Sequence, residues 1–128
     1  MQLKSLDYVV LIVDDIDKAQ RFYTETLGLP LKHRGGEYVQ IALSGTRLGL
    51  FSRSAMASTL GQTLEPESSS TKFELGFKVE NCDAAFAELV ACGVPAVTAP
   101  QTRSWGQRTA YVADPDGNLI ELVEDLPP

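Results

Sequence analysis

An internal repeat constrains the fold of this chain more than any other feature of its sequence. A strand-like stretch, a short acidic segment and a helical stretch occupy residues 8–28, and the same order returns 66 residues later, at residues 74–93. A repeat of about half the chain indicates two similar units, which we expect to bury one another's apolar faces. The residues at equivalent inward-facing positions of the two units should then determine the chemistry.

Each unit is predicted to contain a strand, a helix and three further strands, in the order βαβββ. In the first unit Asp14 or Asp15 can cap the helix, Gly28 can end it, and Ser44-Gly45 suits a tight hairpin turn. In the second unit Asp114-Pro115-Asp116-Gly117 suits a hairpin. The expected strands cover residues 6–13, 31–34, 37–43 and 46–52, then 72–79, 94–98, 106–113 and 118–124.

An apolar stripe runs along each predicted helix. The stripes consist of Ile16, Ala19, Tyr23 and Leu27 in the first helix, and of Cys82, Ala85, Phe86, Leu89 and Val90 in the second. Cys82 and Cys92 flank the second helix and should lie about 15 Å apart along it, beyond the reach of a disulfide. We interpret both cysteines as small, buried apolar residues.

A segment rich in Ser, Thr and Ala, residues 53–71, separates the two units. It is too long for a minimal connection, so it is a linker, a lid or both, and a linker alone is the simpler interpretation. The 128 residues are enough to bury a core. We therefore expect one domain, residues 1–128, made of two repeats at about 1–52 and 72–128.

The composition argues against several classes of protein. With 44% hydrophobic and 22% charged residues, the chain is typical of a globular protein. The formal net charge of −6 argues against a nucleic-acid partner, which requires a basic surface. No apolar run approaches the roughly 20 residues of a membrane span. The N-terminus also lacks the pattern of a secretion signal, so the expected location is the cytoplasm.

Strand alternation predicts which side chains point away from the helices. If the predicted strands curl into one sheet, these side chains line a cup, and their mixture of aromatic, acidic, basic and amide groups is typical of a ligand site. The candidate ligand-binding residues are Tyr8, Tyr38, Arg47, Phe51, Glu74, Trp105, Gln107, Tyr111 and Glu121. The structural alternatives are core packing for Phe51, an anchor on a dimer partner for Trp105, and an ion pair with Arg47 for Glu121.

Two motifs add a resemblance to a known family. The helix end Phe22-Tyr23-Thr24-Glu25-Thr26-Leu27-Gly28-Leu29 and the hairpin Asp114-Pro115-Asp116-Gly117-Asn118-Leu119-Ile120-Glu121-Leu122 resemble the glyoxalase/bleomycin-resistance/dioxygenase superfamily, also called vicinal oxygen chelate. The resemblance covers nearly the whole chain. It implies an α+β fold in which two βαβββ modules form a cup-shaped, curled mixed sheet with the helices outside. It also implies a C2 homodimer.

Enzymes of this superfamily chelate a divalent metal with inward-facing His and Glu residues. The resemblance places those ligands at Tyr8, Gly49, Glu74 and Glu121, of which only the two glutamates are strong ligands. His33, the one histidine of the chain, falls near an exposed turn, where a surface role is the more frequent one. We therefore predict no metal, no cofactor and no catalytic residue.

The missing histidines favour the members of the superfamily that bind without catalysis and sequester bleomycin-, mitomycin- or quinomycin-type drugs. The stretch Trp105-Gly106-Gln107-Arg108, with Asp114–Asn118 after it, resembles the mitomycin-binding type, in which a planar drug stacks in an aromatic-lined cup. The predicted function is metal-independent binding of a small, planar, cationic molecule, with antibiotic resistance as one form. Two alternatives stay open: a metal-dependent lyase, isomerase or dioxygenase built on Glu74 and Glu121, and a regulatory or scaffold module with an unused cup.

Overall fold

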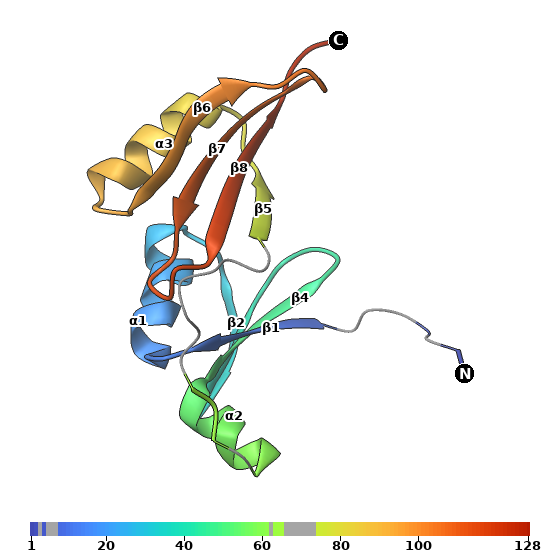
Figure 1. The fold of residues 1–128 in the computed structure, drawn as a ribbon, viewed down its shortest axis with the longest axis vertical. Helices are drawn as coiled ribbons and strands as arrows, with labels where there is room; N and C mark the ends of the chain where they lie inside the picture. Colours follow the sequence, from blue (N-terminus) through green and yellow to red (C-terminus); the bar gives the residue numbers. More distant parts are fainter. Residues whose placement is uncertain (3, 5–7, 62, 66–73) are drawn as a thin grey trace. The chain divides into compact units, whose positions relative to one another are not determined.

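Each half of the chain forms a four-stranded mixed sheet of its own (Figure 1). The structure is a computed structural model, and it describes residues 1–2, 4, 8–61, 63–65 and 74–128. The chain divides into two compact units, Met1–Glu67 and Ser68–Pro128, which we call the N-terminal and the C-terminal module. The expected strand starts at residues 6–7 and 72–73 lie outside the described residues.

In the N-terminal module the first strand lies next to the last one. Strand β1 (Tyr8–Val13) pairs in parallel with β4 (Arg47–Ser52), β4 pairs antiparallel with β3 (Tyr38–Ile41), and β3 pairs antiparallel with β2 (Leu31–Gly35). These strands confirm the four that were predicted. The tight Ser44-Gly45 turn was wrong, because β3 ends at Ile41 and the longer loop 42–46 connects it to β4.

The first helix changes its hydrogen-bonding pattern midway. Helix α1 (Ile16–Arg21) begins after Asp15, whose carboxylate accepts a hydrogen bond from the Lys18 amide at 3.0 Å. It continues as the π-helix η1 (Phe22–Thr26), in which the Leu27 amide donates to the Phe22 carbonyl at 2.8 Å. As predicted, the stripe residues Ile16, Ala19 and Tyr23 are buried, and Leu27 is partly buried.

The segment after β4 contains a helix that the sequence analysis did not predict. Helix α2 (Arg53–Leu60) begins after Ser52, whose hydroxyl accepts a hydrogen bond from the Ala55 amide, and ends at Gly61 in the left-handed conformation (φ 68°). It packs against β4 and β1. The segment predicted as a linker or lid thus contains a helix at residues 53–60, and its role stays a prediction, while residues 62 and 66–71 lie outside the described part of the chain.

The C-terminal module repeats this arrangement. Strand β5 (Glu74–Lys78) pairs in parallel with β8 (Leu119–Asp125), which pairs antiparallel with β7 (Gln107–Ala113), and β7 pairs antiparallel with β6 (Ala96–Thr102). The predicted hairpin between β7 and β8 is confirmed. The Gly117 amide donates to the Asp114 carbonyl at 3.0 Å, and the Asp114 carboxylate accepts hydrogen bonds from the amides of Asp116 and Asn118.

Helix α3 (Cys82–Ala91) covers one face of this sheet, along β6, β7 and β8 (Figure 1). Asn81 caps it, 66 residues after the Asp15 cap of α1. Cys82 and Leu89 are buried as expected, but Val90 is 41% exposed and Cys92 is exposed, so the predicted burial of those two residues was wrong. Val90 and Cys92 lie in the last turn and at the C-cap of α3, just before the chain enters β6.

The two modules confirm the α+β fold class and the βαβββ order. In each, the helix that follows the first strand crosses over to a later strand of the same sheet. The core lies between sheet and helix and includes Leu11, Tyr23 and Leu50 in one module, and Cys82, Val112 and Ile120 in the other. The cup to which both modules would contribute stays a prediction.

Candidate functional site

Burial along the strands confirms the predicted faces. In β3, Val39 and Ile41 are buried against the helices, whereas Tyr38 and Gln40 on the other face are half-buried. In β8, Ile120 is fully buried and Glu121 is half-buried. The candidate residues on the strands of each module therefore share the sheet face that points away from the helices, while Trp105 lies in the turn between β6 and β7. Tyr8, Tyr38, Arg47 and Phe51 lie in the N-terminal module, and the other five in the C-terminal module.

Three candidate residues lie near one another on the C-terminal sheet. The Tyr111 hydroxyl donates to Glu121 Oε2 at 2.8 Å, and the two residues are paired across β7 and β8. Glu74 begins the neighbouring strand β5, two positions before Gly76, which pairs with Glu121. The carboxyl groups of Glu74 and Glu121 therefore share a sheet face and interact electrostatically. The cluster of Glu74, Glu121 and Tyr111, which we call the glutamate cluster, thus presents carboxylate oxygens that can accept hydrogen bonds.

The proximity of these groups changes how they titrate. Burial raises the pKa of Glu74, and the nearby carboxyl group of Glu121 raises it further. The hydrogen bond to Glu121 is the largest cause that raises the pKa of Tyr111 to about 12, and burial and the two glutamate charges add to it. The positive charge of Arg103 opposes that shift. No ion pair joins Glu74 or Glu121 to a basic side chain within the described residues.

Trp105 and Gln107 belong to a second polar group at one end of the same sheet. The Trp105 indole N–H donates to Gln107 Oε1 at 3.0 Å, and Gln107 Nε2 donates to Asp125 Oδ1 at 3.0 Å. Lys78 Nζ donates to both carboxylate oxygens of Asp125, at 2.7 and 2.8 Å. The Lys78 hydrogen bond is the main cause that lowers the pKa of Asp125, followed by the one from Gln107. Lys78 on β5 is thereby linked, through Asp125 and Gln107, to the indole ring of Trp105.

The two groups are separated along the strands. Gln107 and Tyr111 lie four positions apart on β7, as do Asp125 and Glu121 on β8, which corresponds to about 13 Å. Trp105 is 66% exposed. The structure therefore brings Tyr111, Glu121 and Glu74 together, and Trp105 with Gln107, but it does not join all five into one small pocket.

In the N-terminal module, Tyr38 fills the space beside Gly49. A Cβ atom on Gly49 would lie 2.7 Å from the Tyr38 hydroxyl oxygen and 2.8 Å from its ring carbon Cε1. The Tyr38 ring also meets Phe51 edge to face, with centroids 6.1 Å apart. Burial raises the pKa of Tyr38, the nearby Tyr8 adds to the rise, and Arg47 opposes it. Phe51 is half-buried and Tyr8 is 48% exposed.

These positions do not fit a divalent metal. Of the four places that the resemblance assigns to ligands, the Gly49 place has no side chain and is occupied by the Tyr38 ring. The position of Tyr8 holds a phenol, and Glu121 accepts a hydrogen bond from Tyr111. In the described part of the chain, no three His, Cys, Asp or Glu side chains gather as metal ligands. His33 is exposed on β2, as predicted.

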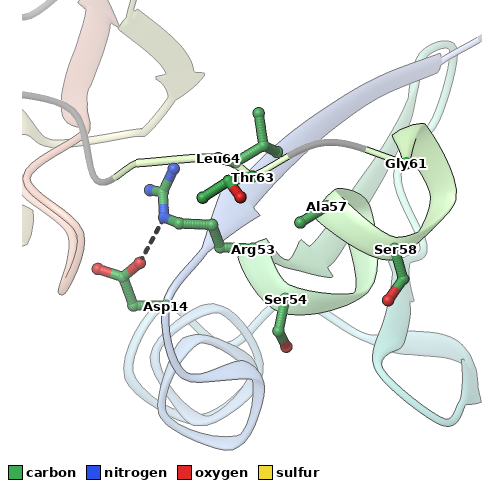
Figure 2. Close-up of a pocket in the computed structure, with 8 residues that line it drawn as sticks. All are labelled: Asp14, Arg53, Ser54, Ala57, Ser58, Gly61, Thr63 and Leu64. Atoms are coloured by element: carbon green, nitrogen blue, oxygen red, sulfur yellow. Dashed lines mark hydrogen bonds and ion pairs between the residues drawn. The ribbon is translucent and has the colours of Figure 1, made fainter.

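A hollow that the sequence analysis did not anticipate lies beside α2 in the N-terminal module. It has a volume of about 720 Å³. Figure 2 shows Arg53 between Asp14 on one side and the α2 side chains Ala57 and Ser58 on the other. Arg53 Nε donates to Asp14 Oδ1 at 2.7 Å, and Nη1 donates to the Glu65 carbonyl at 3.2 Å. None of the predicted ligand-binding residues lines this hollow.

Arg103 is the residue of the C-terminal face that the sequence analysis missed. Its Nε donates to Thr109 Oγ1 at 2.9 Å, and its guanidinium carbon lies 6.0 Å from the centre of the Trp105 ring. A basic residue two positions before an exposed aromatic residue, in a turn between strands, is the signal that could have drawn attention to it.

The fold with paired βαβββ modules is also found in solved structures described as glyoxalase/bleomycin resistance protein/dioxygenase proteins. The fold of this chain matches the crystal structure of a glyoxalase/bleomycin resistance protein/dioxygenase family enzyme from Burkholderia phytofirmans PsJN. The TM-score is 0.83, the identity is 22%, and the match covers 94% of this chain and 98% of that chain. It also matches a glyoxalase/bleomycin resistance protein/dioxygenase from Nocardioides, with a TM-score of 0.82, 23% identity, and coverage of 98% and 86%. At these identities the likeness shows the fold.

The chain belongs to the Glyoxalase-like domain family, whose sequence pattern matches residues 6–127. It is similar to the uncharacterized protein YraH of Bacillus subtilis (strain 168), with 38% identity over 122 residues that cover 91% of this chain and 94% of YraH. YwkD of the same organism, also described as uncharacterized, is 30% identical over 134 residues, which cover 97% of this chain and 99% of YwkD.

No helix in the described ranges is long and apolar enough to cross a membrane.

Proposed function

We propose that this chain binds a small molecule without a metal ion, and that the glutamate cluster contacts a cationic or hydrogen-bond-donating group of that molecule. The observation that carries the proposal is the pair Glu74 and Glu121, which lie on neighbouring strands and one sheet face with no basic partner among the described residues. Tyr111 occupies one oxygen of Glu121 and orients it. The remaining acceptor oxygens suit an ammonium or amidinium group, since charge-assisted hydrogen bonds are the stronger ones.

Binding in place of metal catalysis is supported by the N-terminal module. The Tyr38 ring occupies the space that a ligand side chain at position 49 would need, and the ring is packed against Phe51. Two glutamates alone are a poor set for zinc or iron, which favour imidazole together with carboxylate. A lyase, isomerase or dioxygenase reaction at Glu74 and Glu121 is the competing function, and it requires a stoichiometric metal.

The distance between the two polar groups of the C-terminal module limits the ligand. Tyr111 is paired with Glu121, and Gln107 holds Trp105. A ligand that touches both Glu121 and Trp105 must therefore span much of the distance between Tyr111 and Gln107, which is about 13 Å. A planar molecule of three fused rings satisfies this requirement. Sequestration of such a drug, as in the mitomycin-binding type, is the finer form of the proposal. A homodimer with two equivalent sites and a location in the cytoplasm belong to the same proposal.

The first experiment is elemental analysis of protein purified without chelators. The proposal predicts much less than one transition metal per chain, in wild type and in Glu121→Gln alike. About one metal per chain, lost in Glu121→Gln, would establish the competing enzyme site. Sedimentation at micromolar concentration tests the dimer, and a monomer would contradict it.

The second experiment is calorimetric titration with 9-aminoacridine, a planar cation, and with acridine, its neutral counterpart at pH 7.5. The cation should bind more tightly, and Glu121→Gln should remove the difference because the charge assistance is lost. Trp105→Ala should weaken both compounds by roughly 1–3 kcal/mol, since it removes buried aromatic area. Equal affinity of the two compounds for the wild type would contradict the role of the glutamate cluster. A large fall in melting temperature for Trp105→Ala with intact affinity would show that Trp105 is a structural anchor.

A further inference from the structure

We propose that Arg103 and Trp105, at the tip of the hairpin between β6 and β7, form a binding site for the carboxylate or phosphate group of an aromatic small molecule. We call it the hairpin anion site. It lies beyond the proposed function, because it uses neither Glu74 nor Glu121 and recognises a negative group in place of a positive one. The two sites share one sheet face, so they can act on one dipolar ligand or on separate ligands.

The turn fixes the positions of both side chains. The Gly106 amide donates to the Arg103 carbonyl at 3.2 Å, and the Arg103 amide donates to the Gln107 carbonyl at 2.7 Å. Gly106 takes a left-handed conformation (φ 85°), which favours glycine. The Leu126 amide donates to the Gly106 carbonyl at 3.0 Å, which ties the hairpin to the end of β8. The tip is therefore a constrained turn.

The guanidinium group of Arg103 is held by neutral acceptors. Nε donates to Thr109 Oγ1 at 2.9 Å, and Nη1 donates to Gln101 Oε1 at 3.0 Å. Arg34, Arg53 and Arg108 each form an ion pair with an aspartate, whereas no carboxylate pairs with Arg103 among the described residues. An oriented guanidinium whose charge is not compensated is the group that recognises carboxylate and phosphate, because its planar fork matches their oxygens.

Trp105 supplies a flat surface next to this charge. The Arg103 guanidinium lies over the indole ring at 6.0 Å, and Gln107 holds the indole N–H. Because Trp105 is 66% exposed, much of its surface is open to a ligand. An aromatic ring that bears an acidic group can stack on Trp105 while its oxygens meet Arg103. The structural alternative is that Arg103 and Trp105 only brace the turn against each other, and the experiment must separate the two.

The experiment follows the indole N–H signal of Trp105 by NMR, which is unambiguous because the chain has one tryptophan. The probes are benzoate, phenyl phosphate and benzamide, the last being the uncharged counterpart of benzoate. Benzoate or phenyl phosphate should shift the signal in a saturable way, with an affinity at least about tenfold above that of benzamide. The stronger of the two anions identifies carboxylate or phosphate as the preferred group. Equal affinity for benzoate, phenyl phosphate and benzamide, or no saturable shift with either anion, would overturn the site.

Three variants assign the effect to Arg103. Arg103→Gln should bring the affinity for the anionic probes down to that for benzamide, while Arg103→Lys, which keeps the charge without the fork, should retain an intermediate affinity. Arg21→Gln removes the same charge from the exposed surface of α1 and should change nothing. Unchanged anion binding in a folded Arg103→Gln protein would overturn the proposal. If Arg103→Gln does not fold, the affinity of Arg103→Lys for the anionic probes is the deciding measurement, and an affinity equal to that of the wild type would overturn the proposal.

The two proposals fail separately. The anionic probes carry no positive group, so their binding should not depend on Glu121, and Glu121→Gln should leave it intact. The binding of 9-aminoacridine should survive Arg103→Gln. Loss of anion binding in Glu121→Gln but not in Arg103→Gln would contradict the hairpin anion site and leave the glutamate cluster as the single binding centre.

Discussion

The phenol ring of Tyr38 stands where a side chain on Gly49 would be, with its hydroxyl oxygen 2.7 Å from the position of a Cβ atom. Tyr38 reaches this place because its strand β3 runs next to β4 and pairs Gln40 with Gly49. A side chain at position 49 and a tyrosine at position 38 therefore exclude one another. This exclusion is the clearest physical reason for regarding the N-terminal module as unsuited to a metal ligand.

Gly49→Ala should destabilise the protein by about 1–3 kcal/mol, because the added methyl group must displace a packed aromatic ring. Gly76→Ala is the matched control on the same face of the other sheet, where a Cβ atom would be 3.4 Å from Glu121 Oε1, and it should cost much less. Urea unfolding measures both. In the double variant Tyr38→Ala/Gly49→Ala the two effects should be less than additive. Equal costs for the two glycine variants would mean that Tyr38 moves aside freely.

Tyr111→Phe should destabilise the protein by about 0.5–1.5 kcal/mol, since it removes the hydrogen bond to Glu121. Tyr8→Phe, which alters a half-exposed ring, is the control and should have little effect. Carbon NMR of labelled tyrosine provides a second measurement. Because the pKa of Tyr111 is raised to about 12, its signal should stay nearly constant to about pH 11 in the wild type. In Glu121→Gln the signal should begin to move at a lower pH, because the charged acceptor is gone while burial and the Glu74 charge still act on Tyr111. Identical titrations in the two proteins would contradict the hydrogen bond.

The raised pKa of Glu74 makes a prediction about stability against pH. Between the unfolded and the folded pKa the native state holds more protons, so the free energy of unfolding falls as the pH rises through this window. Glu74→Gln removes the penalty and should melt at a higher temperature than the wild type at pH 7.5, but not at pH 3.5. Glu88→Gln, on an exposed part of α3, removes the same charge and should show no such pH-dependent gain. A wild type that is the more stable protein at pH 7.5 would sink this prediction.

Asp125→Asn should disturb Trp105 without unfolding the module. The variant weakens the contacts of Asp125 with Lys78 and Gln107, and Gln107 holds the indole N–H. The Trp105 indole signal should therefore shift while the melting temperature changes little, as is usual for exposed ion pairs. Because the pKa of Asp125 is lowered, its carboxylate stays charged at neutral pH and through the usual range of an aspartate. The wild-type contacts with Lys78 and Gln107 should therefore be lost only as the pH falls through the lowered pKa.

Asp83→Asn is the control for that experiment. It breaks the ion pair of Asp83 with Arg108 in the same module and should leave the indole signal of Trp105 unchanged. If Asp83→Asn moved the signal as much as Asp125→Asn does, the chain of contacts from Lys78 to Trp105 would have no specific role.

Arg53→Gln should loosen the segment that follows α2. Arg53 connects the Asp14 carboxylate to the Glu65 carbonyl, so its loss frees the backbone near Glu65. Amide hydrogen exchange at Leu64 and Glu65 should become several times faster. Arg34→Gln breaks the ion pair with Asp17 in the same module and should not accelerate that exchange. Equal exchange rates at Leu64 and Glu65 for wild type and Arg53→Gln would rule out this role of Arg53.

The sheets and their faces could be predicted because they depend on local patterns. Apolar and polar residues alternate along a strand with a period of two, and this alternation separated buried Val39 from half-buried Tyr38. The hairpin at Asp114 has a comparable local cause, because its carboxylate satisfies the turn amides itself. The shared face of Tyr111 and Glu121 was predicted, but the hydrogen bond between them was not.

Helix α2 was missed because its Ser-, Thr- and Ala-rich composition is typical of loops, with no strong apolar stripe. Its boundaries nevertheless carry signals, a capping Ser52 and a terminating Gly61. Those two residues were the evidence available before the structure.

Arg103 was missed for a different reason. Its acceptors, Gln101 and Thr109, are paired across β6 and β7, but the register of β6 shifts twice before it reaches Gln101. Such irregularities change the face of the sheet on which a side chain lies. Strict alternation of faces, counted from the predicted strand start at residue 94, does not reproduce them. The contact of Arg103 with Trp105 depends on the turn that follows.

The parallel pairing of β5 with β8 has a consequence for synthesis of the protein. Strand β8 is the last strand of its module in chain order, yet it lies inside its sheet, between β5 and β7. While a ribosome is still making residues 119–125, β5 has no neighbour in its sheet and Glu74 has no Glu121 beside it. The N-terminal module has all of its described strands by Ser52 and can fold first. The glutamate cluster therefore forms late in the folding of the C-terminal module, after the N-terminal module can already be complete.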